Sequence, residues 1–136
     1  MASRLNPYLS FRTDAREAMT FYQSVFGGVL EMNTFGEFGM EGPEAEKIMH
    51  AMLETPSGYT LMGADTPDSM ELVPGSSVTV MLSGDDADEL RGYWEKLSEG
   101  ATIEMPLERQ AWGDDYGALV DRFGVHWGVD IDGSTD

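Results

Sequence analysis

Two histidines and a surplus of carboxylates are the residues of this chain that could carry acid–base chemistry. His50 and His126 are the only imidazoles, and the chain contains no cysteine. An imidazole titrates near neutral pH, so either histidine could orient a ligand or act as a general acid or base. Without cysteine this chain cannot form a disulfide, a thiolate metal site or a cysteine nucleophile. We regard His126 as the best catalytic candidate, with a hydrogen-bonded structural histidine as the alternative.

The carboxylates do not form a recognisable catalytic pattern. A site that uses both histidines with Glu31 or Glu54 is conceivable, but no motif spacing supports it. No pair of carboxylates is placed by spacing for acid–base work. A nucleophile elbow, a phosphate-binding loop and a Rossmann glycine pattern are also missing from the sequence. The residue types alone therefore leave the chemistry open.

Apolar and aromatic residues could form a ligand-binding surface instead. Among the ten methionines, Met52, Met62 and Met81 could line an adaptable apolar concavity, or they could fill the core. A glycine-containing loop carries Trp112 and leads to Tyr116. Such a loop over an open sheet face could be a lid or pocket wall, or it could be a structural anchor.

The elements that must position these residues begin with residues 6–28. An extended apolar run is followed by Asp14, where a helix N-cap would stand, and Glu17 follows three residues later. This spacing predicts a capping box, in which each side chain satisfies a free backbone N–H at the helix start. Gly27 and Gly28 then end the helix.

The same plan recurs later in the chain, which indicates an internal duplication. At an offset of 72 positions Asp14 meets Asp86, and the aromatic pair of the first helix meets that of the second. At an offset of 66 Gly58 meets Gly124. We place the six extra residues of the first half in a long loop over residues 35–46.

Each half is expected to be a βαβββ module. Module one covers residues 4–66, a linker covers 66–76, and module two covers 77–132, within a single domain of residues 1–136. We expect strands over residues 4–11, 29–34, 47–54, 59–63, 77–82, 101–105, 116–120 and 125–131, and helices over 14–26 and 86–98. One helix covers only one face of a four-stranded sheet, so the other face is left for a ligand, a partner or another sheet.

The charge balance limits the partners. Twenty-five acidic residues against eight basic ones give a net charge of −17. This surplus disfavours nucleic acid and anionic membrane surfaces as partners. The acidic residues are spread along the chain, which favours a solvating surface over a cation-collecting one. No apolar stretch approaches the roughly 20 residues that span a bilayer, and no signal-peptide pattern opens the chain. We expect a cytoplasmic protein.

The paired βαβββ plan, the segment FYQSVFGG and the closing segment DRFGVHWGV resemble the vicinal oxygen chelate superfamily. That superfamily includes glyoxalase I, extradiol dioxygenases and bleomycin-resistance proteins. NPYLSF and WGDDYGALVDRFGVHW are similar to its PhnB-like branch. The resemblance covers nearly the whole chain and implies an α+β fold, in which two βαβββ modules form a curved eight-stranded mixed sheet. It implies little about the reaction, because function lies in the site rather than the fold.

The resemblance also implies where a metal site would lie. The metal enzymes of the superfamily hold one divalent ion with four side chains, and the matching positions here are Pro7, Met62, Thr79 and Gly128. None is His, Asp or Glu, and the neighbouring positions supply none either. A catalytic divalent site needs several hard oxygen or imidazole ligands. We therefore expect no metal and no cofactor, with a divalent ion in a rearranged site as the alternative.

Glycine at position 128 leaves room where a ligating side chain would stand. An organic ligand could fill that room, or the pocket could collapse. His126 lies two residues earlier and so shares the face of Gly128, because side chains alternate along a strand. The expected ligand-binding residues are His50, Met62, Thr79, Met81, Trp112, Tyr116, His126 and Gly128.

These observations favour a homodimer, since pairing covers exposed sheet edges and faces. The leading functional hypothesis is metal-independent binding of a small, partly apolar molecule in the sheet concavity, in the manner of bleomycin-resistance proteins. Two alternatives remain. One is a divalent-metal lyase or isomerase of the glyoxalase type with a rearranged site. The other is a non-catalytic interaction dimer.

Overall fold

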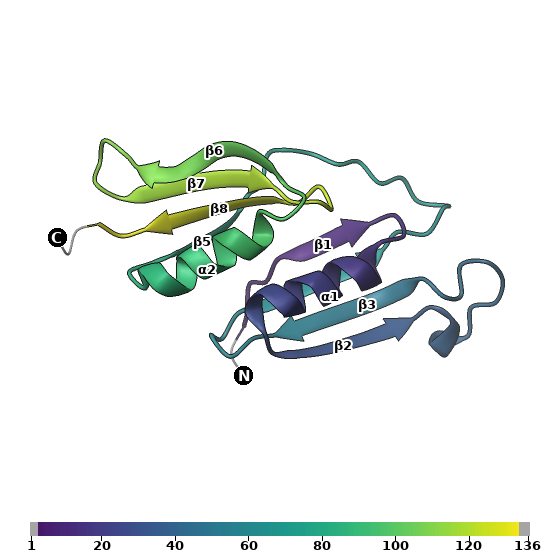
Figure 1. Ribbon diagram of the computed structural model, residues 1–136. Helices are drawn as coiled ribbons and strands as arrows, with labels where there is room; N and C mark the ends of the chain where they lie inside the picture. The colour runs from purple at the N-terminus through teal and green to yellow at the C-terminus, as the bar shows by residue number, and fades with distance from the viewer. Residues whose placement is uncertain (1–2, 134–136) are drawn as a thin grey trace. The chain divides into compact units, whose positions relative to one another are not determined.

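The computed structural model describes residues 3–133, with eight strands, two α-helices and one short 3-10 helix. The chain divides into two compact units between residues 73 and 74, inside the expected linker. Each unit is one βαβββ module (Figure 1). The predicted α+β class and the two-module plan are therefore confirmed. Neither helix in the described part of the chain is long and apolar enough to cross a membrane.

The first unit is built from four strands, α1 and η1. Its strands pair in the order β1-β4-β3-β2, with β1 parallel to β4 and the other pairs antiparallel. Helix α1 packs on one face of this sheet (Figure 1). The elements are β1 (Tyr8–Phe11), α1 (Ala15–Phe26), β2 (Val29–Thr34), η1 (Gly36–Phe38), β3 (Ile48–Glu54) and β4 (Thr60–Asp65).

The second unit repeats this topology. Its strands pair in the order β5-β8-β7-β6, with β5 parallel to β8, and α2 packs on one face. The elements are β5 (Val80–Gly84), α2 (Ala87–Leu97), β6 (Thr102–Arg109), β7 (Asp115–Val120) and β8 (His126–Ile131). In each unit, therefore, the α-helix of that unit covers one face of the sheet and leaves the other face uncovered.

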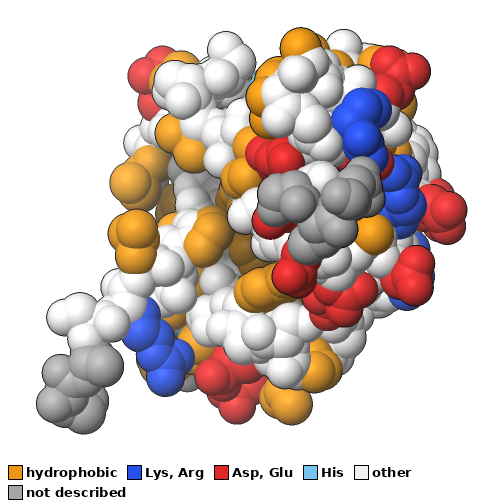
Figure 2. Space-filling model, turned by 90° about the vertical axis from the view of Figure 1, so that its left-hand side faces the viewer, with side chains coloured by type: hydrophobic (Ala, Val, Ile, Leu, Met, Phe, Trp, Pro, Cys, Tyr) orange, Lys and Arg blue, Asp and Glu red, His pale blue; other side chains and the backbone are white. Residues whose placement is uncertain are grey.

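Each core lies between a sheet and its helix. The strand residues at the centre of each core are fully or nearly fully buried, as Leu53 is in the first unit and Trp127 in the second. Burying each such side chain contributes roughly 1.5–3 kcal/mol. In the aromatic pair of each helix, the buried members are Tyr22 and Tyr93, which are 71 positions apart, whereas Trp94 is partly exposed. The expected offset of 72 therefore holds at the N-caps, Asp14 and Asp86, but not at the buried members of the aromatic pairs. On the surface, acidic side chains are scattered over the face drawn in Figure 2.

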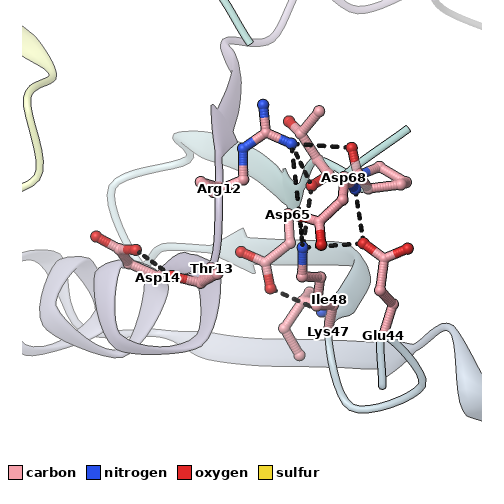
Figure 3. Close-up of polar contacts among 10 residues, drawn as sticks. Arg12, Thr13, Asp14, Glu44, Lys47, Ile48, Asp65 and Asp68 are labelled. Carbon is pink, nitrogen blue, oxygen red and sulfur yellow. Dashed lines mark hydrogen bonds and ion pairs between the residues drawn. The ribbon is translucent and has the colours of Figure 1, made fainter. Parts of the chain in front are cut away.

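The predicted capping box of α1 is wrong. Asp14 stands at the N-cap, but its side chain accepts a hydrogen bond from the Thr13 hydroxyl and none from the helix. The buried carboxylate of Asp65, at the end of β4, accepts a hydrogen bond of 2.9 Å from the backbone N–H of Ala15. It also accepts one of 2.9 Å from the backbone N–H of Ile48 (Figure 3). One side chain thereby starts both α1 and β3. Asp86 does cap α2, because its side chain accepts a hydrogen bond from the Glu89 N–H.

Three strands have boundaries that differ clearly from those expected. Strand β5 covers Val80–Gly84, whereas the sequence predicts residues 77–82. Strand β1 begins at Tyr8 rather than at residue 4, because Pro7 has no N–H and only its carbonyl pairs with β4. Strand β6 runs through Pro106 to Arg109, where a loop was expected after residue 105. An edge strand tolerates proline, and β6 is the edge of its sheet with irregular register on both sides of Met105.

A polar network ties the start of the linker to the first unit (Figure 3). The Lys47 ammonium lies 3.1 Å from both the Glu44 and the Asp68 carboxylates. The Asp68 N–H donates to Glu44 at 2.6 Å, and the Arg12 guanidinium is 3.9 Å from Asp68. The hydrogen bond from Asp68, and then that from Lys47, lowers the pKa of Glu44.

Candidate functional site

The candidate site is the sheet face of the second unit that α2 does not cover. We call it the module-two open face: Met81, Met105, Tyr116, Ala118, His126, Gly128 and Asp130, with Glu104 and Glu108 at its β6 side. Strand register places Met81, Gly128, Ala118 and Met105 in one cross-strand row over β5, β8, β7 and β6. Met81 and Met105 are 44% and 42% exposed. Two small residues thus lie between two accessible methionines.

Met81 covers Gly128. A Cβ atom added to Gly128 would lie 2.7 Å from the terminal methyl carbon of Met81 and 3.0 Å from its sulfur. Gly128 itself is buried. The room left by the glycine is therefore filled by a flexible side chain, which could swing away when a ligand arrives because methionine is unbranched and has three rotatable side-chain bonds.

His126 lies beside a carboxylate. Its Nδ1 is 3.8 Å from Oε1 of Glu104, with side-chain exposures of 19% and 53%. This distance is too long for a hydrogen bond, so the two groups attract each other only when the imidazole is protonated. The pair could still shuttle a proton if a ligand drew the two groups together.

The loop of residues 110–114, which carries Trp112 and which we call the aromatic loop, lies next to the module-two open face. The loop closes on itself through backbone hydrogen bonds from Gln110 to Asp114 and from Gly113 to Gln110. Trp112 is 62% exposed, and its ring centroid is 6.1 Å from that of Tyr116. Trp112 is therefore held by its neighbour but remains accessible, as a pocket wall requires.

Asp130 is a functional candidate that the sequence reasoning missed. It lies opposite Tyr116, and its Oδ1 is buried with no hydrogen-bond partner among the described residues. Burial raises the pKa of Asp130, and so do a hydrogen bond with the Asp114 carboxyl and the charges of Asp114 and Asp132. The alternation of side chains along β8 could have identified it, because Asp130 is two residues after Gly128.

The first unit has a comparable open face. Tyr8, Met62, Met52 and Glu31 form a cross-strand row over β1, β4, β3 and β2. The ring of His50 lies 6.0 Å from that of Tyr8 between centroids. The predicted residues His50 and Met62 thus share a face with an exposed tyrosine.

The predicted ligand-binding residues divide between the two units. His50 and Met62 belong to the first unit. Four of the six residues in the second unit, Met81, Tyr116, His126 and Gly128, lie on the module-two open face. Thr79 precedes β5 and is exposed, and Trp112 is in the neighbouring loop.

The residues at the superfamily's metal positions do not fit a divalent ion. Pro7, Met62, Thr79 and Gly128 offer one thioether and one hydroxyl and no carboxylate or imidazole. Over residues 3–133 no group of three or more His, Asp or Glu side chains is placed to hold a metal. The expectation of no cofactor stays a prediction.

A cleft of about 520 Å³ in the first unit was also not foreseen. It lies between the segment before β1 and the β3–β4 turn, and the Arg4 guanidinium faces the Glu54 carboxylate across it at 4.0 Å. Both of these side chains are more than half exposed. No sequence signal marks it, because it depends on where an irregular N-terminal segment lies.

Comparisons with known proteins agree with this fold. A family model of the Glyoxalase/Bleomycin resistance protein/Dioxygenase superfamily matches residues 4–129. Uncharacterized protein Mb0911c of Mycobacterium bovis is 35% identical over 141 aligned residues, covering 95% of this chain and 86% of that protein.

Two solved structures are also similar. Protein PA1353 from Pseudomonas aeruginosa has a TM-score of 0.87 and 32% identity, covering 96% of this chain and 98% of that one. A putative 3-demethylubiquinone-9 3-methyltransferase, PhnB protein, from Bacillus cereus has a TM-score of 0.74 and 25% identity, covering 96% and 100% of the two chains. The predicted resemblance to the superfamily and to PhnB-like proteins is confirmed.

Proposed function

We propose that this chain, which belongs to the Glyoxalase/Bleomycin resistance protein/Dioxygenase superfamily, binds a small, partly apolar organic molecule on the module-two open face without a metal ion. The observation that carries the proposal is the row of Met81, Gly128, Ala118 and Met105. The small residues form a floor, and the flexible Met81 side chain covers it. Tyr116 supplies an aromatic wall at one side.

The expected affinity of a simple fragment is modest. A phenyl-sized group that removes roughly 150 Å² of apolar surface from water gains about 4 kcal/mol. That free energy corresponds to a dissociation constant of about 1 mM. A fragment screen must therefore run at millimolar concentrations, and it must detect weak binding at identified residues.

The proposal is tested with chelator-stripped protein whose methionine methyl groups carry carbon-13. We expect uncharged phenylalkyl alcohols to shift the methyl resonances of Met81 and Met105 and to leave that of Met70 unchanged. Met70 is a suitable reference because it is 59% exposed and lies outside every strand and helix. Shifts that appear only after a divalent metal is added would refute metal-independent binding.

A substitution at the floor gives a second test. Gly128→Leu fills the space under Met81 and should abolish the ligand-induced shifts. Gly92→Ala in α2 is the matched control, because no atom lies within 4 Å of an added Cβ there. If Gly128→Leu remains folded and binds the alcohols as the parent does, the floor is not the site.

One observation favours a second candidate, a lyase or isomerase of the glyoxalase type. The His126 imidazole beside the Glu104 carboxylate is a possible acid–base pair. A panel of 2-oxo acids and hemithioacetals tests it. We expect His126→Ala and Glu104→Gln each to lower any turnover by at least about tenfold. Turnover that neither substitution changes would remove this pair from the mechanism.

We also propose that the protein is a homodimer located in the cytoplasm. Strands β1 and β6 are both edges of their sheets, and exposed edges are commonly covered by pairing. Sedimentation equilibrium should give twice the 15.0 kDa mass of one chain. A single-chain mass at micromolar concentration would contradict the dimer.

A further inference from the structure

We propose that the module-two open face selects neutral and cationic ligands and rejects anionic ones. This inference rests on the proposed function, and it adds the chemical class of the ligand.

The His126 imidazole on this face lies beside the Glu104 carboxylate, and no lysine or arginine side chain of the second unit lies on the face among the described residues. The unit contains four, Arg91, Lys96, Arg109 and Arg122. Arg91 and Arg109 both bind Asp115, which pairs with a buried residue on the helix side of the sheet. Lys96 is part of α2.

Arg122 is also engaged away from the face. It lies in the β7–β8 turn, where its Nε donates to the Glu99 carbonyl at 3.2 Å and its Nη2 is 3.6 Å from the Glu99 carboxylate. Glu99 follows α2. An anionic ligand on the module-two open face would therefore find no guanidinium or ammonium partner within the second unit.

Carboxylates do lie on the face. Glu108, Tyr116 and Asp130 form one cross-strand row, so one carboxylate lies on each side of the Tyr116 ring. Glu104 adds a third carboxylate beside His126. All three are neighbours of the methionine row in which we place the apolar part of the ligand.

Asp130 adds a specific reason for preferring a hydrogen-bond donor. Its Oδ1 is buried and has no hydrogen-bond partner within residues 3–133, and a buried acceptor of this kind is costly to leave unsatisfied. The raised pKa of Asp130, which follows from burial and the neighbouring Asp114, shows that negative charge is already disfavoured at this point. A ligand ammonium or hydroxyl group could donate a hydrogen bond to the Asp130 carboxylate and so lower the cost of its burial. A ligand carboxylate or phosphonate would instead add a second negative charge beside it and raise that cost.

The test uses three probes with the same apolar part: 4-phenylbutylamine, 4-phenylbutanol and 4-phenylbutanoate. Dissociation constants are measured from the Met81 and Met105 methyl shifts of the full chain at about 20 mM and about 150 mM salt. We expect the amine to bind at least about tenfold more tightly than the carboxylate at low salt, with the alcohol between them. The difference should shrink at the higher salt concentration, because exposed charges are screened.

The net charge of −17 would attract any amine, so a matched control is needed. The variant Glu108→Gln/Asp130→Asn removes two negative charges from the face. The variant Asp88→Asn/Glu95→Gln removes two from the exposed surface of α2. We expect the first to reduce the amine-to-alcohol affinity ratio several-fold and the second to leave it unchanged.

The outcomes separate this inference from the proposed function. If all three probes shift Met81 and Met105 with equal affinity, the face binds ligands but does not select by charge, and the inference is wrong. If the α2 variant lowers the ratio as much as the face variant does, the selection comes from bulk charge and the inference is again wrong. If no probe shifts either methionine, the proposed function and the inference both fail.

Discussion

The turn between β7 and β8 depends on one buried carboxylate, and its removal gives a quantitative prediction. Asp121 is 4% exposed. Its Oδ1 accepts hydrogen bonds from the backbone N–H groups of Phe123 and Val125 at 2.8 and 3.0 Å. Its Oδ2 accepts one from the indole N–H of Trp127 at 2.9 Å. Trp127 is 1% exposed, so its N–H cannot turn to water instead.

The cost follows from the donors that lose their acceptor. Hydrogen bonds to a charged group contribute about 1.5–3 kcal/mol each, and a buried donor left alone costs about 1–3 kcal/mol. Water can reach the two partly exposed turn residues but not the indole. We therefore expect Asp121→Ala to lower the free energy of unfolding by about 3–5 kcal/mol. Asp121→Asn should cost about 2–3 kcal/mol, because the asparagine side chain has only one acceptor oxygen. That oxygen can accept from the backbone N–H groups of the turn or from the indole N–H, but not from both.

A double-mutant cycle isolates the indole contact. Trp127→Phe removes the N–H donor, so Asp121→Asn should cost about 1–2 kcal/mol less in that background than in the parent. Urea unfolding of the four proteins, followed by circular dichroism, measures the free energies. Additive costs within about 0.3–0.5 kcal/mol would refute the assignment of the Asp121–Trp127 hydrogen bond as an energetic contact.

Three further predictions concern stability. Asp65→Ala leaves two backbone donors unsatisfied and should lower the free energy of unfolding in urea by about 2–4 kcal/mol. Asp14→Ala should lower it by less than about 0.5 kcal/mol, and a larger effect there would contradict the assignment of Asp65 as the cap of α1. Because the pKa of Asp130 is raised in the folded protein, its protonated form adds to the free energy of unfolding. This contribution is largest at pH values below the ordinary carboxyl pKa, and it is lost as the pH rises through the raised pKa. Asp130→Asn should therefore raise the melting temperature at pH 7 more than at pH 4, and an equal change at both would disprove the linkage. Gly117→Ala places a methyl group 2.8 Å from a side-chain atom of α2 and 2.9 Å from a backbone atom of β6, so it should cost about 1–3 kcal/mol, while Gly92→Ala should be neutral or stabilising.

The fold could be predicted because its signals are local and occur twice. The aspartates that begin the helices, Asp14 and Asp86, and the last-hairpin glycines, Gly58 and Gly124, fall at two offsets, 72 and 66, and they identify two βαβββ modules. Alternation along β8 then placed His126 and Gly128 on one face, as the structure has them. These inferences need only residue spacing and the period of a strand.

The parts that sequence reasoning missed depend on contacts between distant residues. The residue that caps α1 is Asp65, 50 positions after the N–H of Ala15, so no local motif could indicate it. The Met81 side chain over Gly128 likewise depends on the register of two parallel strands that lie far apart in the chain. In β6, the sequence predicts a strand that ends before Pro106, because the edge position that tolerates this proline is a property of the whole sheet.

Methyl resonances of the chelator-stripped protein in the presence of 4-phenylbutanol test the central proposal most directly. Met81 and Met105 should shift together, in a saturable manner, with a dissociation constant of about 1 mM or lower, and Gly128→Leu should abolish both shifts. Unchanged Met81 and Met105 resonances at millimolar alcohol, or shifts that require added metal, would contradict metal-independent binding on this face.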